Sequence, residues 1–294
     1  MKPLLGSFAA LATPFKDGGL DLDAYRAHAR YLIEQGTDGL VPIGTTGEAS
    51  TMSPAEQALA VKTAVEVSAG KVPVVAGAGS NSTAGTIDSV KRVREAGADA
   101  ALVVTPFYNK PTQDGLVAHY RAVAQAHPGF PLVAYNVPGR TGVDLLPETC
   151  KRLAEIAEVV GVKEATASMT RMVDIVERCG TERLALLSGD DFTIAPFISL
   201  GGKGVISVSA NVAPRLVADL VHAALKGDFK KAAELQVRLN PLHRALFLES
   251  NPIPVKAAMH LLGRFGPEMR LPLTPMSEGP KAKLLESMKG LGLL

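Results

Sequence analysis

The chain has 294 residues, of which 47% are apolar and 20% charged, and its net charge is +2 with both signs interspersed. This is the composition of a globular protein with a substantial core, and it excludes a disordered chain. It gives no electrostatic reason to expect binding to nucleic acid or to an anionic membrane.

The first apolar stretch, residues 4–12, follows Lys2 and superficially resembles a secretory signal. It is brief and runs straight into Thr13 and Pro14, so we interpret it as a first buried strand. No apolar run reaches the roughly 20 residues that a membrane-spanning helix requires. Cys150 and Cys179 match neither a disulfide framework nor metal-ligand spacing. We therefore expect a cytoplasmic protein with reduced thiols.

From this point short apolar runs alternate with amphipathic stretches of helical length. The predicted strands are Ser7–Pro14, Gly39–Gly44, Val72–Gly79, Ala100–Phe107, Pro131–Val137, Val159–Glu164, Leu184–Gly189 and Gly204–Ser209. The predicted helices between them are Asp21–Gln35, Pro54–Ala69, Thr83–Ala96, Gln113–His127, Pro147–Ala157, Met169–Arg178, Phe192–Leu200 and Pro214–Lys226. Continuous apolar strands are typical of a parallel sheet covered on both faces, with helices as crossovers. Eight such units over about 225 residues favour a (β/α)8 TIM barrel over an open doubly wound sheet.

After Gly227 the strand pattern stops, and three further helices are predicted at Asp228–Glu249, Pro254–Arg264 and Pro280–Gly290. We expect a catalytic barrel over residues 1–227 and a C-terminal helical appendage over residues 228–294. Active sites of such barrels form at the C-terminal ends of the strands, so unusual polar residues at those ends are the candidates.

The second predicted strand is followed by Gly44-Thr45-Thr46-Gly47-Glu48, two hydroxyls bracketed by glycines. Backbone N–H groups in such a turn can approach an anion closely, so the segment suits carboxylate binding. A tight turn whose threonines cap the next helix is an equally good interpretation. The segment is not a Walker loop, because the Gly-Lys-Ser/Thr ending is absent.

Two tyrosines and an arginine follow the next strands. Tyr108 lies in a proline-flanked loop after the fourth strand, and Tyr135 and Arg140 end the fifth. A phenol at a strand end can exchange protons with a substrate, and a guanidinium can bind a carboxylate through two hydrogen bonds. For each residue alone, a structural role is the better interpretation: a packing tyrosine bonded to a carbonyl, or an arginine in an ion pair.

Lys163 lies near the end of the sixth predicted strand, in an otherwise apolar run. Lysine is normally at the surface, and a desolvated amine is favoured in its neutral form, which can attack a carbonyl to give a Schiff base. The alternatives are a side chain that extends to solvent, or one neutralised by Glu164. Strand alternation places Lys163, Gly161 and Val159 on one face and Val160, Val162 and Glu164 on the other. This argues against pairing with Glu164, and Gly161 would leave room for the lysine stem.

The last two strands end at Ser188-Gly189 and in Gly204–Ser209, without a glycine pattern for phosphate. The six histidines are scattered over helical segments, and none has metal-ligand spacing with other residues. We therefore predict neither a bound metal nor a phosphorylated substrate.

Taken together, three segments resemble the 4-hydroxy-tetrahydrodipicolinate (dihydrodipicolinate) synthase family. They are Gly44–Glu48, Tyr135–Gly142 and Gly161–Thr166, and the similarity extends over the whole chain, including Asn251–Lys256. The family belongs to the pyruvate-dependent class I aldolases, which also include N-acetylneuraminate lyase. The resemblance implies condensation of pyruvate with aspartate 4-semialdehyde, the entry to lysine and diaminopimelate synthesis, with no cofactor other than the covalent imine of pyruvate.

The resemblance also implies roles for individual residues. Lys163 would form the imine, Tyr135 would donate and accept protons, and Thr45 would pass them to Tyr108, which would serve the neighbouring subunit of a dimer or dimer of dimers. The pyruvate pocket would be formed by Thr46, which holds the carboxylate, together with Ile206 and Gly189. Arg140 would bind the carboxylate of the semialdehyde. Sialic acid lyases carry an apolar residue there, so Arg140 favours the synthase over that enzyme, and keto-sugar-acid aldolases are the nearest rival.

The sequence departs from lysine-inhibited members at the positions that build their effector site. Here those positions are Pro54, Gln57, Gly85 and Phe107, although Asn81 and Ala49 remain. We expect weak or absent inhibition by lysine. Two other interpretations are a phosphate-handling or metal-dependent barrel enzyme, and a ligand-binding protein that has lost the chemistry. The first needs a phosphate cup or metal site, and the second predicts loss of Lys163 or Tyr135.

Overall fold

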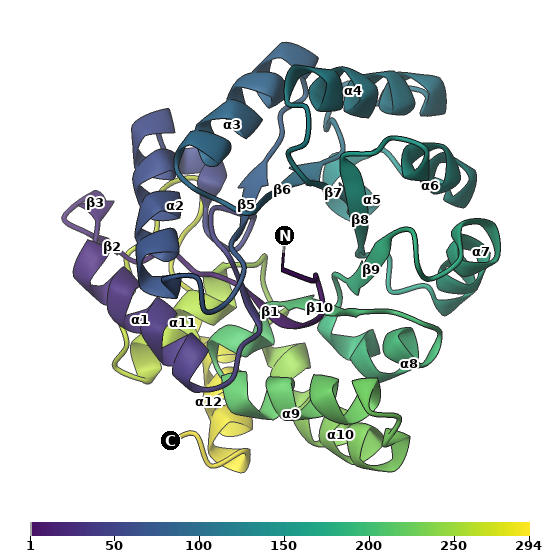
Figure 1. Ribbon diagram of the computed structural model, residues 1–294. Coiled ribbons are helices and arrows are strands. Elements are labelled where there is room, and N and C mark those ends of the chain that lie inside the picture. The colour runs from purple at the N-terminus through teal and green to yellow at the C-terminus, as the bar shows by residue number, and fades with distance from the viewer. Residues whose placement is uncertain (1) are drawn as a thin grey trace.

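Eight parallel strands form a barrel in the computed structural model, which describes residues 2–294 (Figure 1). The strands are β1 (Gly6–Ala10), β4 (Gly39–Val41), β5 (Val75–Ala78), β6 (Ala100–Val104), β7 (Leu132–Asn136), β8 (Val159–Glu164), β9 (Ala185–Ser188) and β10 (Gly204–Ser207). They pair in the order β4-β1-β10-β9-β8-β7-β6-β5, and a bridge between Leu40 and Val74 joins the two ends. A small hairpin, β2 (Phe15–Lys16) and β3 (Gly19–Leu20), lies outside the barrel.

Helices surround the strands and continue beyond them. The barrel helices are α1 (Leu22–Glu34), α2 (Pro54–Ser68), α3 (Thr83–Glu95), α4 (Gln113–Ala126), α6 (Pro147–Ala154), α7 (Met169–Cys179), α8 (Ile194–Ser199) and α9 (Pro214–Leu225), with a single turn, α5 (Pro138–Thr141), after β7. The C-terminal helices are α10 (Phe229–Ala245), α11 (Ile253–Leu261) and α12 (Glu278–Gly290). The predicted fold class is thus confirmed. Helix α2 begins at Pro54 as predicted, because Ser53 at the N-cap and Glu56 in the first turn form a capping box.

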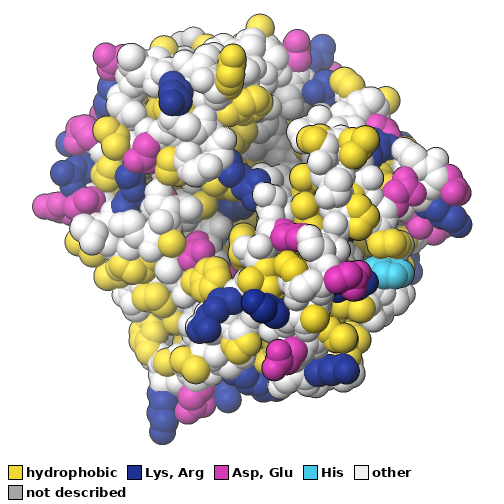
Figure 2. Space-filling model, turned by 180° about the vertical axis from the view of Figure 1, so that it is seen from behind, with side chains coloured by type: hydrophobic (Ala, Val, Ile, Leu, Met, Phe, Trp, Pro, Cys, Tyr) yellow, Lys and Arg dark blue, Asp and Glu magenta, His cyan; other side chains and the backbone are white. Residues whose placement is uncertain are grey.

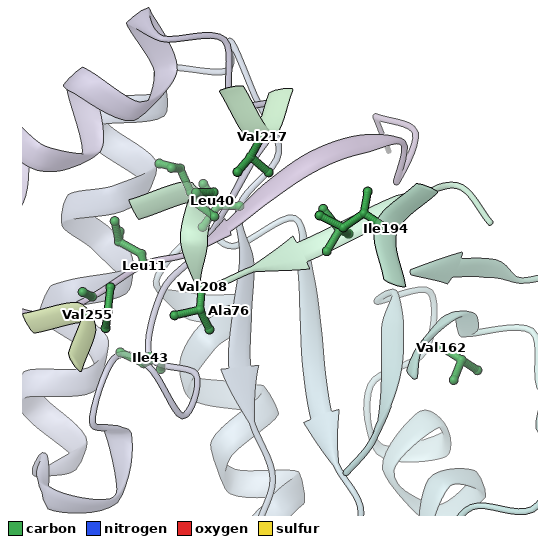
Figure 3. Close-up of a cluster of buried hydrophobic side chains, with 14 of the residues drawn as sticks. Leu11, Leu40, Ile43, Ala76, Val162, Ile194, Val208, Val217 and Val255 are labelled. Atoms are coloured by element: carbon green, nitrogen blue, oxygen red, sulfur yellow. The ribbon is translucent and has the colours of Figure 1, made fainter. Parts of the chain in front are cut away.

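Apolar side chains form two separate layers. One fills the barrel interior, with Phe8, Val133 and Leu187 among its fully buried members. The other lies between the strands and the helices, and Figure 3 shows part of it. Val255 of α11 belongs to this outer layer together with Leu40 of β4. The C-terminal helices therefore share a core with the barrel.

Strand β8 departs from the predicted alternation at its start. Val160 has no register partner in β7, so the pairing shifts by one residue there, as in a bulge. Val159 consequently packs in the outer layer and Val160 against the interior, so the predicted facing of these two residues is wrong. Beyond the bulge the prediction holds, because Lys163 points into the barrel and Glu164 lies outside it.

Within residues 2–294, no helix is long and apolar enough to cross a membrane.

Candidate active site

A cavity of about 710 Å³ lies at the C-terminal ends of the strands. Its wall includes residues at or just beyond the ends of all eight strands, from Ala10 at the end of β1 to Val208 after β10. In the view from behind, the surface is hollowed near its centre, and Lys or Arg side chains reach the edge of the hollow (Figure 2). Six predicted site residues line the cavity: Thr45, Thr46, Tyr135, Arg140, Lys163 and Gly189.

Lys163 is buried in this cavity, with 7% of its surface exposed. Among the described residues no carboxylate pairs with it, and no side chain accepts a hydrogen bond from it. Glu164 instead accepts from the Asn136 carboxamide at 2.9 Å and from the backbone of Thr166 at 2.7 Å, and burial raises the pKa of its carboxyl. The two alternatives for Lys163, exposure to solvent and neutralisation by Glu164, therefore do not describe it.

The space for the lysine stem comes from Gly189, not from Gly161. A Cβ on Gly189 would lie 3.0 Å from Cε of Lys163 and 2.6 Å from Cβ of Ala165. A Cβ on Gly161 would lie 2.7 Å from the carbonyl oxygen of Ala185, so Gly161 permits the close approach of β9. The expectation that Gly161 makes room for Lys163 is thus wrong. Glycine is required at position 161 because the β9 backbone packs closely against it.

Tyr135 is the neighbour of Lys163 across the β7–β8 ladder, where the two residues are in register. The Lys163 ammonium lies 4.2 Å from the centre of the Tyr135 ring. Such a contact stabilises the cation at the ring face. No hydrogen bond from the Tyr135 hydroxyl to a backbone carbonyl is present in the described chain, in contrast to Tyr120, whose hydroxyl donates to Val103 at 2.8 Å.

Asn251, from the C-terminal region, links two predicted binding residues. Its side-chain carboxamide donates to the hydroxyl of Thr46 at 2.9 Å, and its backbone carbonyl oxygen accepts from Arg140 at 3.3 Å. The carboxamide oxygen is buried and has no hydrogen-bond partner among residues 2–294, and Asn251 lines the cavity. Arg140 makes no ion pair within residues 2–294, so its guanidinium is available to an anionic ligand.

A buried ion pair holds the turn that carries Thr45 and Thr46. The carboxylate of Glu48 accepts a hydrogen bond from the ammonium of Lys256 on α11 at 2.5 Å, and both side chains are almost completely buried. Glu48 has φ +54°, a left-handed conformation that is unusual outside glycine. Desolvation lowers the pKa of Lys256, and the Glu48 carboxylate opposes that shift. The turn is therefore anchored from the C-terminal helices.

Two predicted site residues do not line the cavity. Tyr108 is 86% exposed, with φ +74°, and its backbone N–H donates to Thr141 at 3.1 Å. Ile206 is buried in the barrel interior opposite Phe8 of β1. The structure thus brings six of the eight predicted residues together, while Tyr108 projects into solvent.

Several cavity residues were not predicted. Asn251 and Phe247 come from the segment around the end of α10, and Arg92 and Ser89 come from α3. Reasoning from strand ends cannot find them, because none follows a strand. The one sequence signal for them is the Asn251–Lys256 segment, which resembles the family but indicates no role for an individual residue. No cluster of three His, Cys, Asp or Glu residues suited to a metal occurs within the described chain.

Comparison with known proteins identifies the family. The model of the dihydrodipicolinate synthetase family matches residues 3–290. The 4-hydroxy-tetrahydrodipicolinate synthase of Anaeromyxobacter sp. is 56% identical over 293 residues, covering 100% of this chain and 99% of the relative. The synthase of Maridesulfovibrio salexigens is 51% identical, covering 98% of this chain and 99% of the relative.

Solved structures that resemble this chain are also dihydrodipicolinate synthases. A chloride-inhibited dihydrodipicolinate synthase from Acinetobacter baumannii, in complex with pyruvate, superposes with a TM-score of 0.97 at 44% identity, covering 99% of this chain and 100% of that one. A lysine-bound synthase from Cyanidioschyzon merolae gives 0.95 at 38% identity, with both chains covered completely. This chain belongs to the dihydrodipicolinate synthetase family of lyases.

Proposed function

We propose that this enzyme condenses pyruvate with L-aspartate 4-semialdehyde through an imine on Lys163, and thereby opens lysine and diaminopimelate synthesis. The observation that carries the proposal is a buried lysine that pairs with no carboxylate among residues 2–294. It is in register with Tyr135 and faces a cavity that Arg140 also lines. No cofactor beyond the covalent imine is needed for this chemistry.

In the first step the neutral amine of Lys163 attacks the keto carbon of pyruvate, and water leaves as the C=N bond forms. The carbinolamine hydroxyl must be protonated before it departs. We assign this proton to the hydroxyl of Tyr135, whose ring centre lies 4.2 Å from the lysine nitrogen. Thr46, bound by Asn251, supports a site for the pyruvate carboxylate beside the Gly44–Glu48 turn. Gly189 keeps the space beside the lysine stem open, and Ile206 closes the barrel interior below.

In the second step the pyruvyl methyl loses a proton to give an enamine, whose carbon attacks the aldehyde of the second substrate. The aldehyde oxygen takes a proton and becomes a hydroxyl. The amino group of the former semialdehyde then displaces Lys163 from the imine carbon, which closes the ring and restores the free lysine. Tyr135 would carry these protons, with Thr45 passing them towards Tyr108.

Tyr108 supports an oligomer in this scheme. A large side chain that is 86% exposed at the end of a stiff loop has no role within its own cavity, which it does not line. We propose that it completes the site of a neighbouring copy in a dimer or dimer of dimers.

We also propose a cytoplasmic location, a catalytic barrel over residues 1–227 and a C-terminal helical region over 228–294 that completes the site through Asn251.

Arg140 supports the choice of the second substrate. It carries a cation into the cavity, and within residues 2–294 its one hydrogen-bond partner is a backbone carbonyl, so it can bind a carboxylate near the aldehyde. A keto-sugar acid aldolase would instead need groups that bind sugar hydroxyls. Comparing turnover with aspartate 4-semialdehyde against sugar-derived aldehydes separates these activities, and preference for the sugar aldehydes would contradict the proposal.

Borohydride trapping tests the imine. With pyruvate present, we expect one reduced pyruvyl group on Lys163, located by peptide mass spectrometry. Lys163→Ala should give none, while Lys203→Ala, at a half-buried lysine paired with Glu182, should be labelled as the wild type is. The absence of an adduct in the folded wild-type protein would refute the proposed mechanism.

We further propose that lysine inhibits the enzyme weakly or not at all. Gln57 and Gly85 line the cavity, and neither has a carboxylate that could pair with the ammonium group of a lysine effector. Turnover measured with millimolar lysine tests this, and strong inhibition would overturn it.

A further inference from the structure

A buried pair of polar side chains, Asn136 and Glu164, lies behind the two residues that the proposed chemistry uses. Asn136 and Glu164 are register partners in β7 and β8. Each directly follows a reacting residue, Tyr135 in β7 and Lys163 in β8. Because successive side chains of a strand point to opposite faces, this second pair projects away from the cavity, which neither residue lines. Asn136 is fully buried, Glu164 is nearly so, and the proposed chemistry uses neither side chain.

The carboxamide of Asn136 uses both of its donors and its acceptor. Its Nδ2 donates to the carboxylate of Glu164 at 2.9 Å and to that of Asp144 at 2.9 Å. Its Oδ1 accepts from the backbone N–H of Leu145 at 2.9 Å. Asparagine and glutamine alone offer two N–H donors and a carbonyl acceptor in one uncharged group. One side chain therefore ties the end of β7 both to β8 and to residues 144–145.

Two of these hydrogen bonds close the loop that carries Arg140. The loop leaves β7 at Asn136, passes through α5 and returns at Asp144 and Leu145, which the Asn136 side chain binds. Arg171 of α7 also holds the returning end, since its guanidinium pairs with Asp144 and donates to the carbonyl of Leu145 at 3.1 Å. Arg140 thus lies in a loop whose two ends are fixed to each other.

Glu164 extends the same connection to Lys163. Both of its carboxylate oxygens are occupied, one by Asn136 and the other by the backbone N–H of Thr166 at 2.7 Å. Its backbone carbonyl accepts from the N–H of Gly189 at 2.7 Å, and Gly189 is the residue that makes room for the lysine stem. Because Glu164 is held at its side chain and its backbone, the end of β8 has little freedom to rotate. Lys163 therefore keeps its direction into the barrel.

We propose that Asn136 is a positioning residue, whose carboxamide fixes the two reacting side chains and the Arg140 loop relative to one another. A misplacement of about 1 Å in a reacting group can cost about 10²-fold in rate, so the loss of Asn136 should appear in turnover as well as in stability. The inference rests on the proposed function, because it concerns the roles given there to Lys163, Tyr135 and Arg140.

Asn136→Asp tests the role with a nearly isosteric change. The new carboxylate would face those of Glu164 and Asp144, and it offers acceptors where two donors are needed. We expect kcat, measured well below the melting temperature of the variant, to fall by about 10²-fold. The KM for the semialdehyde should rise, because the Arg140 loop loses its closure. The KM for pyruvate should change less, since the Gly44–Glu48 turn has an anchor of its own.

Adding Glu164→Gln to Asn136→Asp should restore turnover. The double variant has the same net charge as the wild type and reverses the hydrogen bond, because the carboxamide at position 164 now donates to the carboxylate at position 136. An oxygen at position 164 still accepts from Thr166. We expect recovery of at least about tenfold in kcat, a coupling typical of two residues in contact. Glu164→Gln alone should lower kcat, because one of its two acceptors becomes a donor.

Gln236→Glu is the matched control, since it also turns a carboxamide that bridges two segments into a carboxylate. Gln236 of α10 is half-buried, donates to the backbone carbonyl of Asp191 at 2.9 Å and accepts from the N–H of Ala195 at 3.1 Å. The control should lower the melting temperature and leave kcat unchanged. If Asn136→Asp does not fold, Asn136→Ala, which adds no charge, takes its place in the kinetics, and the double variant should still fold and turn over.

The outcomes separate this inference from the proposed function. A wild type that shows neither turnover nor a borohydride adduct would overturn the proposed function and the inference with it. An active wild type overturns the positioning role alone in two cases. The first is a folded Asn136 variant that keeps the wild-type kcat, and the second is a double variant no more active than Asn136→Asp.

Discussion

The ammonium of Lys256 lies 2.5 Å from the carboxylate of Glu48, and 208 residues of sequence separate the two. This ion pair joins helix α11 to the turn that presents Thr45 and Thr46. Lys256 also lies 4.4 Å from the centre of the Phe15 ring, so its charge is enclosed on two sides. The Gly44–Glu48 turn, which faces the cavity, is thus held in place by helix α11, which lies outside the barrel.

Lys256→Met should therefore affect both stability and substrate binding. Removing one partner of a buried pair leaves an uncompensated charge, which costs about 3–5 kcal/mol of folding free energy. The pyruvate KM should also rise, because the Gly44–Glu48 turn loses its anchor. Denaturant unfolding and steady-state kinetics measure the two effects.

The matched control is Lys281→Met, at a largely exposed pair with Glu278, which should change stability by no more than about 1 kcal/mol. Adding Glu48→Gln to Lys256→Met should recover part of the lost stability, because the unpaired charge is then gone. Equal destabilisation by the Lys256 and Lys281 variants would contradict the assigned role of the buried pair.

Asn251→Ala should raise the KM for pyruvate, since it removes the carboxamide that donates to Thr46. It keeps the backbone carbonyl that accepts from Arg140, so the KM for the semialdehyde should change little. The loss of one neutral hydrogen bond predicts an increase of up to about tenfold for pyruvate. Arg140→Ala, in contrast, should impair use of the semialdehyde and leave borohydride trapping of pyruvate nearly intact. Kinetics with each substrate varied in turn separates the two patterns, and an identical pattern for both variants would refute the division of roles.

The contrast between Lys163 and Asn251 shows what the sequence could predict. Lys163 and Tyr135 each end an apolar run, and the ends of parallel strands meet at one mouth, so their proximity follows from the periodicity. Asn251 reaches Thr46 across 205 residues from a segment that has only a helical pattern, and no local rule connects them. The bulge at Val160 does not follow from the sequence for a related reason, since it is a property of the pairing with β7 and not of β8 alone.

Tyr135→Phe removes the proposed proton carrier and keeps the ring on which the lysine ammonium rests. We expect kcat to fall by about 10²–10⁴-fold, the range for loss of a general acid–base group, with little change in stability. Tyr120→Phe is the control, because that hydroxyl donates to Val103 in the core and should affect stability more than turnover. A Tyr135→Phe enzyme with near-normal kcat would rule out the proton route.

His222 lies at the end of the barrel opposite the cavity. We expect it to make a pH-dependent contribution to the folding stability of the protein. Its Nε2 lies 2.7 Å from the carboxylate of Asp38, which also accepts a hydrogen bond from the backbone N–H of Ser7 in β1. This hydrogen bond raises the pKa of His222 above its ordinary value of 6.5. Because the folded-state pKa is the higher one, the stabilisation is complete below the unfolded pKa and is lost as pH rises through the folded pKa.

Melting temperatures measured across that window test the assignment. The wild type should lose stability relative to His222→Gln as the pH rises from below 6.5, the ordinary pKa of histidine, through the raised folded-state value. His260→Gln, at an exposed histidine without such a partner in the described chain, should track the wild type. Buried His28 provides the opposite sign, because desolvation lowers its pKa to about 4, so its contribution is lost as the solution is acidified below 6.5. If the wild-type and His222→Gln curves stay parallel across the window, the Asp38–His222 bond contributes no pH-dependent stability.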